Sequence, residues 1–336
     1  MIFSKALGAT FDSLLEKDPR VLILGEDIAD PYGGAFKVTK GLTSKYPERV
    51  KTTPVSEDAL AGLSAGLALS GYRPITEFMF GDFIALTFNQ VVNHIAKYQE
   101  MYAGGATCPV ILRTPSGGGR GYGPTHSQSL EKHFFGIPHF KVFAASLYHN
   151  PEEIFSYLLS QDSPALYIEH KLLYPLHLAE GNNNAYENLN LSEDKQGVDT
   201  ATCSLLAVPR EDCELTVVAY GYQGHLVAQV IERLAVEDEI FVELLVPAQI
   251  SDVDWGPIER SVAATKRLLT VEEGTGGWSW GSEIATYINK KFFGELASPV
   301  EVLASERTIV PSAKTLEEKM LVGEEKIEQS IREILR

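Results

Sequence analysis

The chain alternates short runs of aliphatic and β-branched residues with segments of helical periodicity, and this alternation limits its fold more than any other feature. In the first half, strands are expected at residues 21–24, 74–77, 110–113, 141–144 and 165–169, and helices at 58–70, 86–102 and 151–160. Strands separated by helices pair in parallel, and the helices cover the sheet. The sequence therefore predicts an α/β fold with mainly parallel sheets.

A polar, Asn-rich stretch divides the chain into two such units. Residues 180–197 read EGNNNAYENLNLSEDKQG and show almost no periodicity, which is typical of an interdomain linker. After it, strands are expected at 215–219, 241–246, 268–272 and 300–303, and helices at 225–234, 258–265, 282–292 and 317–335. We therefore predict domains at residues 1–179 and 201–336, joined by a linker at 180–200.

Composition and charge exclude several classes of partner. The formal net charge of −16 disfavours nucleic acid, whose binding requires a basic face. The most lipid-like stretch, residues 59–69, is far shorter than the ~20 residues of a membrane span. The three cysteines form neither a CxxC pair nor an even set, and no long apolar run follows a basic N-terminus. We therefore expect a cytoplasmic protein with reduced thiols that binds neither nucleic acid nor membrane.

Common catalytic motifs are absent, and the remaining candidates are ambiguous when taken singly. The sequence contains no GxxxxGK[ST] phosphate loop and no HExxH zinc motif. In TPVSEDALAGLSAG (53–66), Glu57 falls at the start of a helix, where the positive dipole end favours a carboxylate. His126 follows the glycine-rich run SGGGRGYG (116–123) and could act as an acid or base. Taken singly, these residues favour a helix-capping acid at Glu57 and a structural histidine at 126, and a core role for Phe83 is open as well.

The whole ordered set of runs resembles a known family, the beta subunits of the thiamine-diphosphate-dependent decarboxylating components of 2-oxo acid dehydrogenase complexes. This family includes the pyruvate and branched-chain enzymes. The runs are GEDIADPYGGAFKVTKGL (25–42), RVKTTPVSEDALAG (49–62), GYRPITEFMFGDF (71–83), NQVVNHIAK (89–97), HSQS (126–129), YIEHKLLY (167–174), VVAYG (217–221) and VEEG (271–274). They extend over nearly the entire chain. The resemblance implies a pyrimidine-binding α/β domain followed by a smaller transketolase-type C-terminal domain.

The resemblance also implies the roles of four residues. Glu57 matches the acid that contacts N1′ of the cofactor's aminopyrimidine, and Phe83 matches the aromatic residue that packs on the pyrimidine. Glu26 matches an acid close to the cofactor. His126 matches a histidine that serves acid–base work around decarboxylation and acyl transfer to a lipoyl arm. The implied cofactor is thiamine diphosphate, and the implied substrate is a 2-oxo acid such as pyruvate.

Half of the expected cofactor site is missing from the sequence. Enzymes of this class hold the diphosphate and Mg²⁺ with a GDG…N motif, but Gly81 and Asp82 are followed here by Phe83. The resemblance therefore implies an alpha subunit that binds Mg²⁺, an α₂β₂ heterotetramer and a lipoyl acyltransferase as a further partner. We expect the chain to be inactive alone.

Departures from the family's pattern keep two alternatives open. Thr52 and Asn89 stand where Asp is usual. Gln161 also replaces an Asp in the set that matches the family's potassium site, which here comprises Val110, Leu158, Gln161 and Ser163. One alternative is an acyloin-forming carboligase component with its own alpha partner and no lipoyl carrier. The other is a non-catalytic structural paralogue, which intact Glu57, Phe83 and His126 disfavour.

Overall fold

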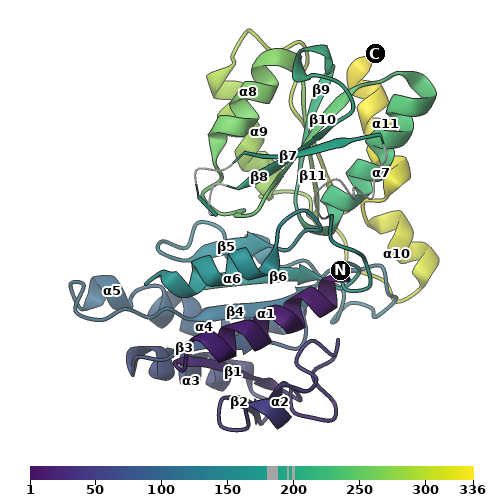
Figure 1. The fold of residues 1–336 in the computed structure, drawn as a ribbon. Coiled ribbons are helices and arrows are strands. Elements are labelled where there is room, and N and C mark those ends of the chain that lie inside the picture. Colours follow the sequence, from purple (N-terminus) through teal and green to yellow (C-terminus); the bar gives the residue numbers. More distant parts are fainter. Residues whose placement is uncertain (180–187, 195–196, 199–200) are drawn as a thin grey trace.

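The first half of the chain forms a six-stranded parallel sheet (Figure 1). The computed structural model describes residues 1–179, 188–194, 197–198 and 201–336. The sheet has the order β2-β1-β3-β4-β6-β5, with β1 (Val21–Glu26), β2 (Val50–Thr53), β3 (Arg73–Glu77), β4 (Ile111–Ser116), β5 (Lys141–Ala144) and β6 (Ala165–His170). The five predicted strands are confirmed. The edge strand β2 was not predicted, because its KTT residues are mostly exposed and carry no apolar pattern.

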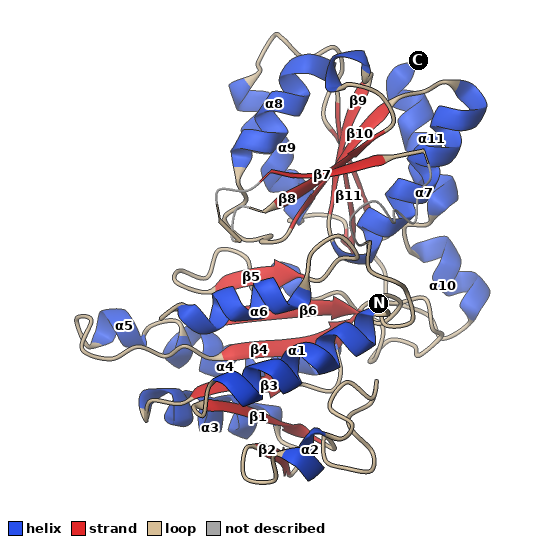
Figure 2. Cartoon of the chain, in the orientation of Figure 1, coloured by secondary structure: helices blue, strands red, loops and turns tan. Residues whose placement is uncertain are grey.

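Helices cover both faces of this sheet (Figure 2). On one face lie α1 (Phe3–Lys17) and α6 (Pro151–Ser160), and on the other lies α3 (Glu57–Leu69). The remaining short elements are α2 (Leu42–Lys45), η1 (Gly81–Thr87), α4 (Phe88–Gln90), η2 (Val91–Ile95), α5 (Tyr98–Met101) and η3 (Glu131–His133). A single helix at 86–102 was therefore a wrong prediction. Its hydrogen bonds change from 3₁₀ to α to π spacing, which hydrophobic periodicity does not reveal.

The second half forms another six-stranded sheet, of order β12-β11-β9-β10-β8-β7. Its strands are β7 (Asn190–Asp194), β8 (Thr202–Leu206), β9 (Leu215–Ala219), β10 (Val242–Pro247), β11 (Leu268–Thr275) and β12 (Glu301–Ser305). Only β7 and β8 are antiparallel to their neighbours. The helices are α7 (Gly221–Asp238), α8 (Trp255–Thr265), α9 (Trp280–Lys291), α10 (Lys314–Met320) and α11 (Glu324–Leu335), with the short turn η4 (Arg210–Asp212).

Part of the predicted linker belongs to this second sheet. Strand β7 lies inside the range 180–200 and pairs with β8, from Asn190 opposite Leu206 to Asp194 opposite Thr202. Residues 180–187, 195–196 and 199–200 of that range lie outside the described residues. The domain boundaries therefore stay a prediction, although the second sheet takes in an edge strand from the linker.

One apolar cluster continues from the first sheet into the second. It includes Leu60 and Ala61 of α3, Leu166 of β6, and Trp280 and Ile284 of α9, all nearly inaccessible to solvent. The indole Nε1–H of Trp280 is satisfied by the backbone oxygen of Ile250 at 3.0 Å. Because the two units share packed side chains, residues of the second unit can bind loops at the edge of the first.

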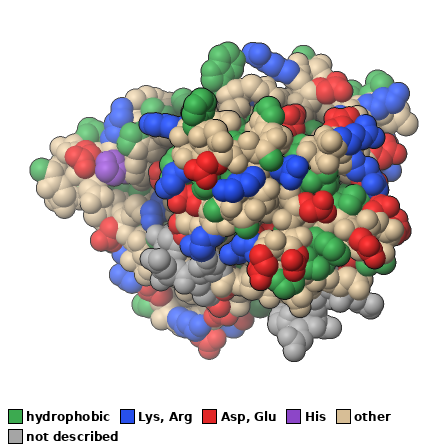
Figure 3. Space-filling view, turned by 90° about the horizontal axis from the view of Figure 1, so that it is seen from above, with side chains coloured by type: hydrophobic (Ala, Val, Ile, Leu, Met, Phe, Trp, Pro, Cys, Tyr) green, Lys and Arg blue, Asp and Glu red, His purple; other side chains and the backbone are tan. Residues whose placement is uncertain are grey.

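The surface carries charges of both signs. On the face seen in Figure 3, Lys and Arg side chains are interspersed with Asp and Glu. A continuous basic face, which a nucleic-acid partner would require, is not present on that side. No helix in the described parts of the chain has the length and apolar character needed to cross a membrane.

Candidate active site

Two predicted site residues, Glu26 and Glu57, lie at the carboxyl end of the first sheet. Glu26 ends β1, and Glu57 is the first residue of α3. The backbone N–H of Ser56 donates to Glu26 Oε1 at 3.1 Å, so Glu26 holds the residue just before Glu57. The side chains are only 2% and 7% exposed. The two acids thus form one buried acidic site at the positive end of a helix.

This acidic site carries no compensating cation. Burial raises the pKa of Glu26, and the negative charge of Glu57 raises it further. Among the described residues, no Lys or Arg forms an ion pair with either carboxylate. Two buried acids without a cation are costly, and such sites favour a proton or a positively charged hydrogen-bond donor.

The other two predicted residues, Phe83 and His126, contact each other. Phe83 lies in η1 after β3, and His126 lies in the loop after β4. Their ring centroids are 5.2 Å apart in an edge-to-face arrangement, and Phe80 packs on the same imidazole at 4.9 Å. Since α3 packs against η1, this aromatic group and the acidic site are carried by neighbouring elements at one end of the sheet. The structure thus brings together residues far apart in sequence.

Lys171 supports His126 and was not identified as a site residue from the sequence. Its Nζ donates to the backbone oxygen of His126 at 2.5 Å and lies 5.5 Å from the centroid of Phe80. Burial lowers the pKa of Lys171 to about 8. Although Lys171 lies within the matching run YIEHKLLY, no local pattern reveals a contact across 45 residues.

A buried ionic network lies within the same sheet. The guanidinium of Arg113 donates to both oxygens of Glu169 at 2.6 Å and also to Glu77. Tyr174 donates to Glu169 Oε2 at 2.6 Å. All of these groups are nearly inaccessible, and burial raises the pKa of Glu77 in spite of Arg113. The bidentate geometry satisfies the network internally, so it stabilises the strands rather than awaiting a ligand.

The chain is similar to known proteins over nearly its whole length. Residues 1–177 match the model of the transketolase pyrimidine binding domain, and residues 206–327 match that of the transketolase C-terminal domain. The chain is 33% identical over 331 residues to a pyruvate dehydrogenase E1 component subunit beta of Porphyra purpurea, covering 98% of this chain and 95% of the relative. It is 31% identical over 336 residues to the 2-oxoisovalerate dehydrogenase subunit beta of Bacillus subtilis, covering 99% and 98%.

The chain belongs to the family of 2-oxo acid dehydrogenase beta subunits. A further relative is the acetoin:2,6-dichlorophenolindophenol oxidoreductase subunit beta of Cupriavidus necator, which is 30% identical over 340 residues and covers 98% of this chain and 96% of the relative. The expected fold class, a thiamine-diphosphate-binding pyrimidine domain with a transketolase-type C-terminal domain, is confirmed.

The residues of this beta subunit fit the aminopyrimidine end of thiamine diphosphate. Glu57 offers a buried carboxylate acceptor to a ring nitrogen, and Phe83 and Phe80 offer aromatic surface. Asp82 Oδ2 is buried and has no hydrogen-bond partner among the described residues, so it can accept a hydrogen bond from a polar group of a ligand. These buried acceptors and aromatic rings therefore suit a planar heterocycle with a ring nitrogen that can carry a proton.

One group of metal-ligating side chains among the described residues does not suit Mg²⁺. The one group of three ligand-type side chains close enough to share an ion comprises His149, Glu193 and Cys203 near the β7–β8 edge. A thiol and an imidazole suit softer metals than Mg²⁺, which prefers oxygen ligands. This group also includes none of the four predicted site residues.

The residues that match the family's potassium site do not fit a cation as they stand. The backbone oxygen of Val110 accepts from Ala165 N–H at 2.9 Å. The backbone oxygen of Leu158 accepts from Gln161 N–H at 3.2 Å. The guanidinium of Arg73 donates to the backbone oxygen of Gln161 at 2.6 Å and would repel K⁺ at that atom.

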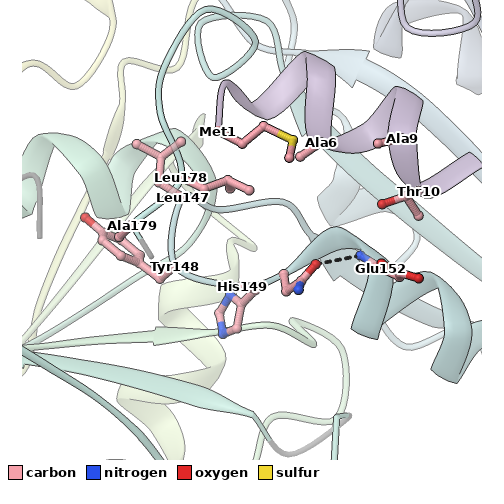
Figure 4. A pocket seen from close by; sticks show the side chains of 11 residues that line it. Met1, Ala6, Ala9, Thr10, Leu147, Tyr148, His149, Glu152, Leu178 and Ala179 are labelled. Atoms are coloured by element: carbon pink, nitrogen blue, oxygen red, sulfur yellow. Dashed lines mark hydrogen bonds between the residues drawn. The ribbon is translucent and has the colours of Figure 1, made fainter. Parts of the chain in front are cut away.

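A separate hollow lies on the α1 side of the sheet (Figure 4). It is lined by Ala6 and Thr10 of α1, by residues 147–150 after β5, and by Leu178. In Figure 4 the dashed bond runs from Glu152 N–H to Asn150 Oδ1, which caps α6. None of the predicted site residues lines this hollow, so it is distinct from the candidate active site.

Proposed function

We propose that this chain is the beta subunit of an acyl-transferring 2-oxo acid dehydrogenase and that, with an alpha subunit, it decarboxylates a 2-oxo acid such as pyruvate or a branched-chain 2-oxo acid. The observation that carries the proposal is the buried acidic site of Glu26 and Glu57, which has no cation among the described residues and lies at a helix N-terminus. Helix α3 packs against η1, which carries Phe83, and Phe83 contacts His126. Membership of the beta-subunit family supports it.

Each proposed role combines the family resemblance with the position of the side chain. Thiamine diphosphate, when bound, supplies a carbon nucleophile for the 2-oxo acid carbonyl and a sink for the electrons left by CO₂. Glu57 accepts a hydrogen bond from N1′ and stabilises a proton at that nitrogen, because a carboxylate in a water-poor site favours the charged donor. Phe83 packs on the pyrimidine plane, and Glu26 holds Ser56 and thus the start of α3.

His126 is the group available for proton transfer. Its ring is partly buried against Phe80 and Phe83, and its Nδ1 lies 3.0 Å from the hydroxyl of Thr125. If the hydroxyl donates to Nδ1, the neutral ring carries its proton on Nε2 and can donate a hydrogen bond from there, and the protonated ring can serve as a general acid. We propose that this proton transfer accompanies delivery of the acyl group to a lipoyl arm of an acyltransferase.

The partner in this proposal is an alpha subunit that binds the diphosphate and Mg²⁺ in an α₂β₂ heterotetramer. The sequence has no GDG…N motif, and Gly81 instead begins η1, where an added Cβ would lie 2.6 Å from Ser116 Cβ. The test is decarboxylation of 2-oxo acids with thiamine diphosphate and Mg²⁺, by this chain alone and after mixing with its alpha subunit. Activity should require both chains. Robust Mg²⁺-dependent turnover by this chain alone would overturn the proposal.

A second candidate is an acyloin-converting enzyme of the same cofactor class. The similarity to the Cupriavidus necator acetoin oxidoreductase subunit supports it, as acetoin is an acyloin. Assaying the reconstituted enzyme with pyruvate and with acetoin, each with a lipoyl domain or an artificial electron acceptor, separates the two candidates. Turnover of acetoin but not of 2-oxo acids would favour the second.

We further propose a cytoplasmic location. Cys108, Cys203 and Cys213 are buried and form no disulfide bonds, as in proteins of reducing compartments. Cell fractionation followed by immunodetection of the chain tests this location, and recovery in a membrane or secreted fraction would contradict it.

A further inference from the structure

The glycine-rich loop that leads to His126 is bound by two carboxylates of the C-terminal unit. The N–H of Gly118 donates to Glu273 Oε1 at 2.8 Å. The N–H groups of Gly119 and Gly121 donate to Glu317 Oε1 at 3.0 Å and to Glu317 Oε2 at 2.8 Å. The positive φ angles of Gly119 and Gly121, 82° and 70°, belong to a concave turn of the kind whose backbone N–H groups bind an anion. The bound anion here is a side chain of the protein itself.

Both carboxylates are placed by packing as well as by these bonds. Glu317 lies in α10, is fully buried and faces the loop, while Leu321 lies so close that a Cβ on Gly118 would sit 2.6 Å from Leu321 Cδ1. Glu273 lies within β11. It also accepts a hydrogen bond from Ser129 Oγ at 2.9 Å, and its Oε2 lies 2.8 Å from His170 Nε2. The C-terminal unit therefore binds the loop before His126 through the glycine N–H groups, and it binds the segment after His126 through Ser129.

We propose that Glu317 and Glu273 are positioning residues, which fix the glycine loop and thereby place the His126 ring against Phe83 for proton transfer. The inference rests on the proposed function of His126. Lys171 donates to the backbone oxygen of His126 at 2.5 Å, so Glu273, Glu317 and Lys171 together fix the loop from both units. The C-terminal unit thus contributes to the active site without itself touching substrate.

The substitution Glu317→Gln tests this inference by removing half of the anchor. A carboxylate presents acceptor oxygens to both N–H groups, whereas an amide presents one oxygen and one NH₂ donor. One glycine N–H would then face another donor inside a buried site. The matched control is Glu318→Gln, the same change on the next residue of the same helix, whose side chain is exposed.

The first readout is hydrogen–deuterium exchange of the amides of residues 118–121 in the full chain. Glu317→Gln should speed exchange roughly tenfold to a hundredfold, since bonds to a charged acceptor protect these amides. Glu318→Gln should match the wild type. Glu317→Asp keeps both oxygens and the charge but shortens the side chain, so its exchange should be intermediate. This variant also serves if Glu317→Gln does not fold.

The second readout is turnover after reconstitution with the alpha subunit. Glu317→Gln should lower kcat roughly tenfold with KM changed less than about twofold, because the loop places an acid–base group rather than a substrate contact. Exchange no faster than in Glu318→Gln would overturn the anchor. Faster exchange with unchanged kcat, while His126→Ala lowers kcat, would overturn the positioning role. If His126→Ala also leaves kcat unchanged, the acid–base role in the proposed function fails and the positioning role falls with it. The exchange data alone then report whether the anchor exists.

Discussion

Two groups of buried carboxylates occupy the N-terminal sheet, and they differ in one respect. Glu77 and Glu169 share the guanidinium of Arg113, which satisfies Glu169 with two bonds of 2.6 Å. Glu26 and Glu57 have no cation among the described residues, and the pKa of Glu26 is raised by burial and by Glu57. Buried acids that share a cation are compatible with a structural role. Buried acids without a cation lower the stability of the fold, which points to a functional role instead.

We therefore assign a structural role to the Arg113 network and a role in the reaction to the acidic site of Glu26 and Glu57. The Arg113 network lies between β3, β4 and β6, where it links three neighbouring strands. The acidic site lies at the end of β1 and the start of α3, outside the Arg113 network. Changes in the first group should therefore affect folding, and changes in the second should affect the reaction.

The largest effect is expected from Arg113→Met. Removing the guanidinium leaves two buried acids unpaired, which should lower the free energy of unfolding by roughly 3–5 kcal/mol. Chemical denaturation followed by circular dichroism measures it. The control is Arg20→Met, which removes an exposed guanidinium paired with Asp18 and should leave the midpoint unchanged. An unchanged midpoint for Arg113→Met would show that the network is not structural.

His126→Ala should lower turnover rather than folding stability. Turnover of the reconstituted enzyme should fall by roughly 10²–10⁴-fold, the usual contribution of a general acid–base group, while the unfolding midpoint barely changes. The loss should be greatest at acyl transfer to a lipoyl domain, and cofactor binding should persist. Steady-state kinetics with His177→Ala as an exposed control measures this. Equal activity of both variants would make His126 a structural residue.

Acid should weaken the protein through Glu273. Burial raises its pKa, but His170 and the donors around it lower it more, to about 2 from 4.5. A carboxylate with a depressed folded-state pKa contributes stability above pH 4.5 that is lost as pH falls toward 2, here roughly 3 kcal/mol. Denaturation midpoints at pH 6 and pH 3 measure this slope. The slope should flatten in Glu273→Gln, and an equally steep slope in that variant would assign the loss to other groups.

The smallest effect on stability is expected from Glu26→Gln. Because the folded-state pKa of Glu26 is raised, the fold binds its proton more tightly, and stability decreases as pH rises above 4.5. A neutral amide removes that cost, so the melting temperature at pH 7 should be unchanged or higher by roughly 1–2 °C. At pH 4 the difference should vanish. A clear loss of stability at pH 7 would place Glu26 with the structural acids.

Much of this arrangement could be predicted from the sequence. The central strands carry apolar runs that specify burial on both faces, and the start of α3 was predicted to within one residue because small residues and acids follow Pro54. Strand β8, which lies between β10 and the edge strand β7, was missed because it directly follows the linker. Helix α1 was missed although Phe3, Leu7 and Phe11 follow helical spacing.

The long-range contacts of Glu317 and Arg113 could not be predicted in this way. Glu317 lies 196 residues from Gly121, and a single acid in a short helix looks like any exposed acid until the tertiary fold buries it. Arg113 likewise looks like a charged strand residue, and only the parallel register places it beside Glu77 and Glu169. Long-range pairing of polar side chains leaves no periodic signal in the sequence.

The role of Glu57 is the central claim, and proton exchange at C2 of bound thiamine diphosphate tests it most directly. The measurement uses the enzyme reconstituted with its alpha subunit, with exchange followed by NMR in deuterated water. Glu57→Gln should slow exchange a few hundredfold or more, equivalent to ~3–5 kcal/mol in activation, because a neutral amide cannot stabilise the protonated N1′. Asp58→Asn, at the next and exposed position of the helix start, should exchange like the wild type. Equal rates for Glu57→Gln and wild type would reduce Glu57 to a helix-capping acid.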